Sequence, residues 1–201
     1  MSPEIPLGER LERLVSLHEA AQRRAGDPDW KVGLYAPATE AQLDRIDAHL
    51  GRLLPEEARE LYLWHNGCGY TAFVPGVDFQ KLEVAYQWWL PTRQLATPFE
   101  VTNRQGAIEV RVLFPVFNIN KLSLDVMTSV ERRAKSSPLY LLDLEMTRLT
   151  LQAHSIRNFI EHLIGLFEHG YVESTEHGLR WTREPYSFDP SMTPYGDQPD
   201  G

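Results

Sequence analysis

The sequence predicts a mixed α+β fold built as a single domain. Apolar residues recur with helical spacing through most of the first half of the chain and again after Ser155. Residues 108–153 instead contain short apolar runs, some of them alternating with polar residues, which is typical of strands. With 201 residues, 42% of them hydrophobic, the chain can bury a sizeable core. We expect one domain over residues 1–171 and an acidic, proline-bearing, partly mobile tail over residues 172–201.

The charge balance and the cysteine content limit the classes of function. The net charge is −8 and the sequence pI is about 5.4. This disfavours a nucleic-acid binder, because such proteins hold phosphates with Lys and Arg, but it permits a basic protein partner. Cys68 is the only cysteine, so an intrachain disulfide is impossible. The chain has neither a signal-peptide pattern nor an apolar run of about 18 residues, so we expect no membrane span and a cytoplasmic location.

Two helices are predicted in the first fifty residues. The first covers residues 9–25 and carries an apolar stripe. His18 lies on that stripe without a second ligand one turn away, so we expect a core-edge histidine rather than a metal ligand. The second helix begins at Thr39, because Gln42 three residues later completes a capping box, and it ends before Gly51.

Residues 54–67 are predicted to form a third, buried helix closed by a tight turn. Pro55 suits the first helical turn, and the glutamates after it favour the positive end of the helix dipole. Asn66 and Gly67 tolerate positive φ and therefore end the helix. Trp64 lies off the apolar face, so the helix is expected to touch two neighbours. That apolar face holds Ala58, Leu61, Tyr62 and His65.

Neither DNA binding nor catalysis is indicated around this helix. A DNA-reading helix-turn-helix has basic residues on its second helix, whereas this one carries three glutamates and a single arginine. His65 and Cys68 lack the second Cys or His pair that a zinc site needs, and Cys68 has no nucleophile signature. We therefore expect no catalytic residue, metal or cofactor. An enzyme would need His65, Cys68 and a carboxylate with perturbed pKa values gathered in one pocket.

The helix predicted over residues 79–89 carries two adjacent tryptophans. Trp88 and Trp89 are either part of the core or an aromatic patch that faces a partner, since tryptophan is enriched at binding hot spots. Pro91 is expected to stop this helix. The one apolar side of the helix holds Leu82, Ala85, Tyr86 and Trp89. The other predicted elements are an extended segment at 30–35, a loop at 91–106, strands at 108–114, 116–118 and 122–127, a loop at 130–137, a hairpin of 139–144 with 149–153, and a helix from Ser155 to Gly170.

Residues 39–69 resemble the SUKH superfamily, the Smi/Knr-like domain. The family pattern is a capped helix start, a glycine, Leu-Pro, an amphipathic helix, and an aromatic residue followed by x-Asn-Gly and a further glycine. The matching pieces here are Thr39-Glu40, Gly51, Leu54-Pro55, Leu61 to Trp64, and Asn66-Gly67-x-Gly69. The order of later elements is also similar, so the resemblance covers about residues 9–170. It departs from the family around residues 91–106 and after residue 171.

The resemblance implies an antiparallel sheet with helices packed against it and no established catalytic residues. It further implies an immunity protein, which binds and blocks a toxin, often a nuclease. The acidic balance fits a toxin with a basic surface. The fold-signature residues are Leu54, Pro55, Leu61, Trp64, Asn66 and Gly67, and the expected partner contacts are Tyr70, Asp78, Glu83, Trp88 and Trp89. The alternatives are a regulatory scaffold of the same fold and an enzyme with an unrecognised site.

Overall fold

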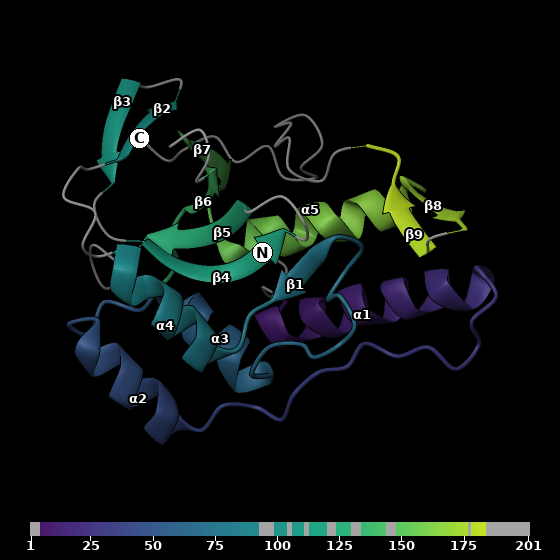
Figure 1. Cartoon of the computed structure of the whole chain (residues 1–201), viewed down its shortest axis with the longest axis horizontal. Helices are drawn as coiled ribbons and strands as arrows, with labels where there is room; N and C mark the ends of the chain where they lie inside the picture. The colour runs from purple at the N-terminus through teal and green to yellow at the C-terminus, as the bar shows by residue number, and fades with distance from the viewer. Residues whose placement is uncertain are drawn as a thin grey trace.

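The computed structural model of the chain describes residues 5–92, 99–103, 106–110, 113–119, 124–129, 134–143, 148–176 and 178–183. Within these residues, five helices and nine strands form a mixed α+β fold, which confirms the predicted class (Figure 1). Five strands form one antiparallel sheet in the order β1-β4-β5-β6-β7, and the other four form two separate antiparallel hairpins, β2-β3 and β8-β9.

The elements have the following bounds. The helices are α1 (Leu7–Arg24), α2 (Glu40–His49), α3 (Glu56–Trp64), α4 (Leu82–Thr92) and α5 (Ile156–Glu168). The strands are β1 (Val77–Phe79), β2 (Phe99–Asn103), β3 (Gly106–Val110), β4 (Leu113–Ile119), β5 (Leu124–Ser129), β6 (Leu139–Asp143), β7 (Arg148–Ala153), β8 (Val172–Thr175) and β9 (Gly178–Trp181).

The core lies between the five-stranded sheet and the helices that cover it. β4 is buried on both faces, since five consecutive residues from Leu113 to Phe117 are inaccessible to water. α4 packs along β4, and α1 packs against α5 (Figure 1). The ring of Phe117 lies 5.4 Å from that of Phe159 on α5 and 5.7 Å from that of Phe79 on β1. These contacts make one continuous hydrophobic core.

The local signals for helix ends hold. The capping box of α2 is formed: the Thr39 N–H donates to Gln42 Oε1 at 2.8 Å, and the Gln42 N–H donates to Thr39 Oγ1 at 3.2 Å. The Ser155 side chain caps α5 by accepting the Asn158 N–H at 3.0 Å, and Gly170 follows that helix with a φ of 73°. Pro115 lies at a register shift between β4 and β5, as expected for a proline inside a strand.

The helix predicted over residues 79–89 begins later and ends later than expected. Phe79 is the last residue of β1, where it pairs with Phe117 and its N–H donates to the Cys68 sulfur at 3.2 Å. α4 begins at Leu82 and continues past Pro91 to Thr92. A proline near the end of a helix removes only one of its last hydrogen bonds, so it does not stop the helix there.

The strand predicted over residues 108–114 belongs to two different sheets. Its first part lies in β3, which pairs with β2, and its last two residues open β4. β2 occupies part of the predicted loop over 91–106, while residues 93–98 and 104–105 of that loop lie outside the described residues. In the expected extended segment at 30–35, Leu34 forms an isolated bridge with Cys68, and backbone hydrogen bonds join Tyr35 to Gly67 and Gly33 to Gly69. Alternation predicts a strand but not the sheet to which it belongs.

The chain beyond residue 171 starts with a hairpin packed on the domain, so the domain extends past the predicted boundary. Trp181 donates its indole N–H to the Pro75 carbonyl at 2.6 Å, and its ring lies 5.0 Å from that of Phe167. Figure 1 shows β8 and β9 at one end of the molecule and α2 at the other. Residues 184–201 of the predicted tail lie outside the described residues. None of the described helices is both long and apolar enough to cross a membrane.

Candidate partner-binding surface

The turn after α3 determines where α4 begins. Asn66 is buried, and its side-chain carbonyl accepts the Leu82 N–H at 2.8 Å, which satisfies one of the free N–H groups at the start of α4. Its amide donates to the Glu83 carboxylate at 3.2 Å. Gly67 has a φ of 86°, and a Cβ at this position would lie 2.7 Å from the Lys81 backbone nitrogen. The Asn-Gly pair therefore joins α3 to α4 by close contact, and only Gly67 uses the predicted positive φ.

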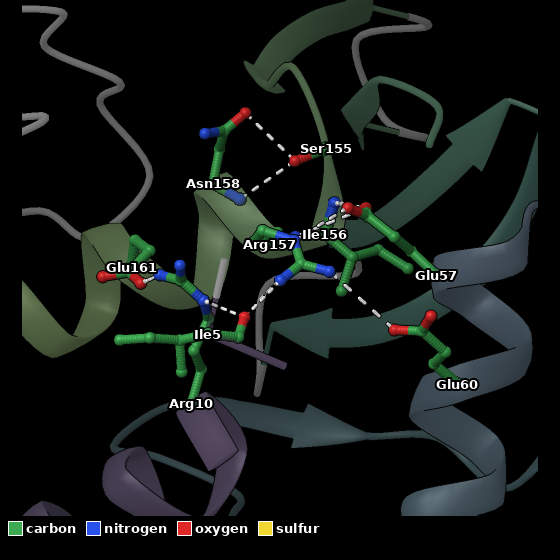
Figure 2. Close-up of polar contacts among 9 residues, drawn as sticks. All are labelled: Ile5, Arg10, Glu57, Glu60, Ser155, Ile156, Arg157, Asn158 and Glu161. Carbon is green, nitrogen blue, oxygen red and sulfur yellow. Dashed lines mark hydrogen bonds and ion pairs between the residues drawn. The ribbon is translucent and has the colours of Figure 1, made fainter. Parts of the chain in front are cut away.

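A buried carboxylate on α3 closes the N-terminus of α5 (Figure 2). Glu57 accepts the Ile156 N–H at 3.0 Å and the Arg157 N–H at 3.4 Å, and the Arg157 Nε lies 3.5 Å from its other oxygen. Burial raises the pKa of Glu57, while the backbone donors and the guanidinium of Arg157 oppose that rise. A negative charge at the start of a helix offsets the helix dipole, so this contact fixes α3 against α5.

The same cluster reaches α1 and the segment before it (Figure 2). Arg157 donates through Nη1 to the Ile5 carbonyl at 2.7 Å, and Arg10 donates through Nε to the same oxygen at 3.2 Å. Arg10 also pairs with Glu161 on α5, and Arg157 lies 3.9 Å from Glu60 on α3. The helices α1, α3 and α5 are thereby connected around the N-terminal part of α3.

A second charged cluster joins α2 to α3. Arg59 on α3 donates to Glu40 at 2.7 Å and to Asp44 at 2.8 Å, and it lies 3.4 Å from Asp47. Asp47 is buried and accepts the Leu54 N–H at 2.9 Å, at the point where the chain enters α3. Within the described residues α3 therefore contacts α1, α2 and α5, three helices where two neighbours were expected.

Two of the predicted contact residues are well exposed beside this framework. Tyr70 is fully exposed in the loop after the signature turn, and Trp88 is 54% exposed on α4. Glu83 is half-buried, because its carboxylate accepts N–H groups from Gln42 at 3.1 Å and from Asn66. Asp78 is half-buried on β1, opposite Asn118 of β4.

Trp89 was the wrong choice as a surface contact. It is 3% exposed, and its ring stacks on Tyr86 with the centroids 5.8 Å apart. Leu82, Ala85 and Trp89 lie at i, i+3 and i+7, so all three face the core when α4 packs on β4. A side chain this deeply buried touches a partner only after the helix has moved.

Three further residues extend this surface, of which Val84 is exposed and Tyr35 and Lys81 are half-buried. Val84 is 39% exposed one turn before Trp88, on the same side of α4. Lys81 precedes α4, and its Nζ lies 3.5 Å from the centre of the Tyr35 ring. A Cβ on Gly69, which precedes Tyr70, would lie 3.3 Å from the Tyr35 hydroxyl, so the tyrosine connects the loop with the start of α4. We call this set the α4 surface: Tyr35, Tyr70, Lys81, Val84 and Trp88.

The fold holds the cysteine and the two histidines that the sequence singles out in defined contacts. The Cys68 thiol donates to the Phe79 carbonyl at 3.4 Å, and burial raises its pKa to about 11, so it stays protonated at neutral pH. His65 Nδ1 lies 2.6 Å from the Tyr35 carbonyl. His18 is buried in the core, where desolvation lowers its pKa to about 4. No group of three or more His, Cys, Asp or Glu within the described ranges has the arrangement of a metal site.

The α4 surface combines two exposed rings, those of Tyr70 and Trp88, with a nearby turn in which the buried Asn66 side chain accepts the hydrogen bond that holds the start of α4. Sequence reasoning found Tyr70 and Trp88 but missed Tyr35, Lys81 and Val84; the spacing of Lys81, Val84 and Trp88 at i, i+3 and i+7 was the available signal for the last two. No protein-family model matches the chain, and no curated protein matches it.

Proposed function

We propose that this chain is a non-catalytic, protein-binding domain of the SUKH type that acts in the cytoplasm as an immunity protein. It neutralises a toxin by stoichiometric binding through the α4 surface. The observation that carries the proposal is the exposure of Trp88 and Tyr70 beside a rigid turn. Large aromatic side chains are mostly buried in monomeric proteins, and tryptophan and tyrosine dominate the energetics of protein interfaces.

The SUKH assignment is supported by the way the signature residues are used. Leu54 and Leu61 are completely buried, and Trp64 packs on the core while its indole N–H donates to Glu12 at 2.7 Å. Asn66 and Gly67 position α4, Asn66 through its side-chain hydrogen bonds and Gly67 through its close packing. A motif with these contacts is a framework, and a framework suits a family in which the displayed surface varies from one member to the next.

A binding role is also supported by the state of Cys68. A protonated, buried Cys68 is a poor nucleophile, since the thiolate is the reactive form. The net charge of −8 favours a basic partner, because opposite fields accelerate encounter. A reduced single cysteine fits a cytoplasmic protein.

The test is direct binding to a toxin domain encoded beside this gene. We expect the purified pair to form a complex of fixed stoichiometry in size-exclusion chromatography, and the complex to have lost the toxin's activity. Trp88→Ala should weaken the complex at least tenfold, whereas Gln87→Ala, an exposed neighbour outside the α4 surface, should leave it unchanged. No binding to any neighbouring toxin domain contradicts the proposal. A neighbourhood without a toxin gene favours a scaffold of the same fold.

A further inference from the structure

The rings of the α4 surface differ in what covers them. The Tyr35 ring already carries a cation, since the Lys81 ammonium lies 3.5 Å from its centroid. Tyr70 and Trp88 are exposed, and within the described part of the chain neither makes a hydrogen bond, a ring contact or a cation contact. Val84 is the only other large apolar side chain exposed on α4 in that part. The surface therefore offers two open aromatic faces and little aliphatic area.

The chain that carries these rings is acidic, with a net charge of −8. Asp78 and Glu83 are close in sequence to Lys81, which is the one basic residue between them. The Glu83 carboxylate accepts N–H groups from the amides of Gln42 and Asn66, and neutral donors do not cancel its charge. A negatively charged protein attracts cations and repels carboxylates.

We propose that the partner places arginine side chains flat against Trp88 and Tyr70, so that the α4 surface recognises a basic protein segment by cation–π stacking. Tryptophan is the strongest side-chain acceptor for this contact, and arginine is its commonest donor. Lys81 on Tyr35 shows the same contact made within the chain. Trp88 lies two helical turns from Lys81, about 10 Å along α4, so one interface of ordinary size covers both sides of the surface. This inference rests on the proposed binding role and names the chemistry of the partner.

The experiment uses the full chain, labelled with ¹⁵N, and a glycine–arginine repeat peptide as the probe. The control peptide contains citrulline in place of arginine, which keeps the shape of the side chain and removes its charge. The indole N–H signal of Trp88, assigned from a Trp88→Phe variant, should shift with the arginine peptide and stay in place with the citrulline peptide. The backbone signal of Tyr70 should behave in the same way. Binding should weaken as salt is added, because ionic contacts are screened.

The variants separate stacking from simple charge. Trp88→Leu keeps an apolar side chain without a π face and should weaken binding of the arginine peptide about fivefold. Trp88→Phe should weaken binding of the arginine peptide less than Trp88→Leu does, and Gln87→Ala should leave this binding unchanged. Equal shifts with the citrulline peptide overturn the inference, as do shifts confined to residues outside the α4 surface. Stronger binding of a glutamate repeat peptide or of single-stranded DNA overturns it as well.

This result and the test of the proposed function can fail separately. If a toxin complex forms and depends on Trp88 while the arginine peptide does not bind there, the cation–π inference is wrong and the immunity role stands. If the arginine peptide binds at Trp88 while no neighbouring toxin binds, the recognition chemistry stands and the immunity role is wrong.

Discussion

The turn after α3 and the outer face of α4 are close in sequence but opposite in character. Asn66 and Gly67 are buried and pack closely against the residues at the start of α4. Trp88 and Tyr70 are exposed, and their side chains make no hydrogen bond, ring contact or cation contact within the described residues. The first pair determines the position of α4, and the second pair is what α4 and its loop display. Substitutions in the two regions should therefore have separable effects, on folding in one and on binding in the other.

The largest effect is expected at Gly67. In Gly67→Ala the new Cβ would lie 2.7–2.9 Å from backbone atoms of Gln80 and Lys81, and backbone cannot move aside as a side chain can. We expect a loss of about 3–5 kcal/mol in the free energy of unfolding, measured by urea denaturation, or failure to fold.

Gly26→Ala is the matched control for that substitution. Gly26 also has a positive φ, of 104°, but a Cβ there meets nothing within 4 Å. It should cost only the conformational penalty of about 1–2 kcal/mol. If the two substitutions lower the free energy of unfolding equally, the positive φ alone accounts for the effect and the close packing of the turn adds nothing. That result would remove the contrast between the two regions.

His18 tests how far the buried framework extends from the signature turn. Its Nδ1 lies 3.0 Å from the Phe73 carbonyl, and its Nε2 is buried without a hydrogen-bond partner among the described residues. Desolvation lowers its pKa from 6.5 to about 4. Between pH 4 and pH 6.5 the His18 side chain is therefore protonated in the unfolded chain and neutral in the folded chain. The stabilisation is therefore complete above pH 6.5 and is lost as the pH falls towards 4, by about 3 kcal/mol.

The measurement compares the native chain with His18→Phe at pH 7 and pH 4.5. Phenylalanine keeps an aromatic ring beside Trp30 and Phe167 but does not titrate. The native chain should lose about 2–3 kcal/mol more than the variant between the two pH values. If both proteins lose the same free energy of unfolding between the two pH values, His18 is accessible to water and does not belong to the buried framework.

A third test concerns the charged contacts between α3 and the start of α5. Glu57→Gln removes the charge that Arg157 and the start of α5 share, and we expect unfolding to become easier by about 2–3 kcal/mol. Glu60→Gln is the control, because Glu60 is half exposed and lies 3.9 Å from the same arginine. Its loss should stay below about 1 kcal/mol. Similar values for the two variants would place the Glu57 contact among ordinary surface ion pairs.

The contrast also explains which features were predictable from sequence. Caps such as Thr39 with Gln42 and the stripe of α1 depend on neighbours within one or two turns, and those predictions hold. The exclusion of Trp89 was available from its spacing to Leu82, since both belong to one helical face. The adjacency of two tryptophans suggested a patch, but adjacent helical residues point in different directions.

Other features depend on residues that are far apart in the chain. The Glu57 contact with α5 joins positions separated by about half the sequence, and no spacing rule predicts it. The placement of Lys81 over Tyr35 is of the same kind. The strands β2, β8 and β9 were missed because they are short and carry polar residues, which are typical of a loop or a tail, whereas part of β3 lay inside the strand predicted over residues 108–114. Local chemistry predicted the elements, and only the tertiary contacts show which surface they expose.

The smallest effect on stability is expected at Trp88. Trp88→Ala removes a half-exposed ring, so the free energy of unfolding should change by about 0.5 kcal/mol or less while partner binding falls. Trp89→Ala removes the neighbouring ring from the core and should cost about 3–5 kcal/mol. Thermal and urea unfolding of the two variants measure this difference directly. If both tryptophans prove equally costly, Trp88 is a packing residue in solution, and the α4 surface loses its main anchor for a partner.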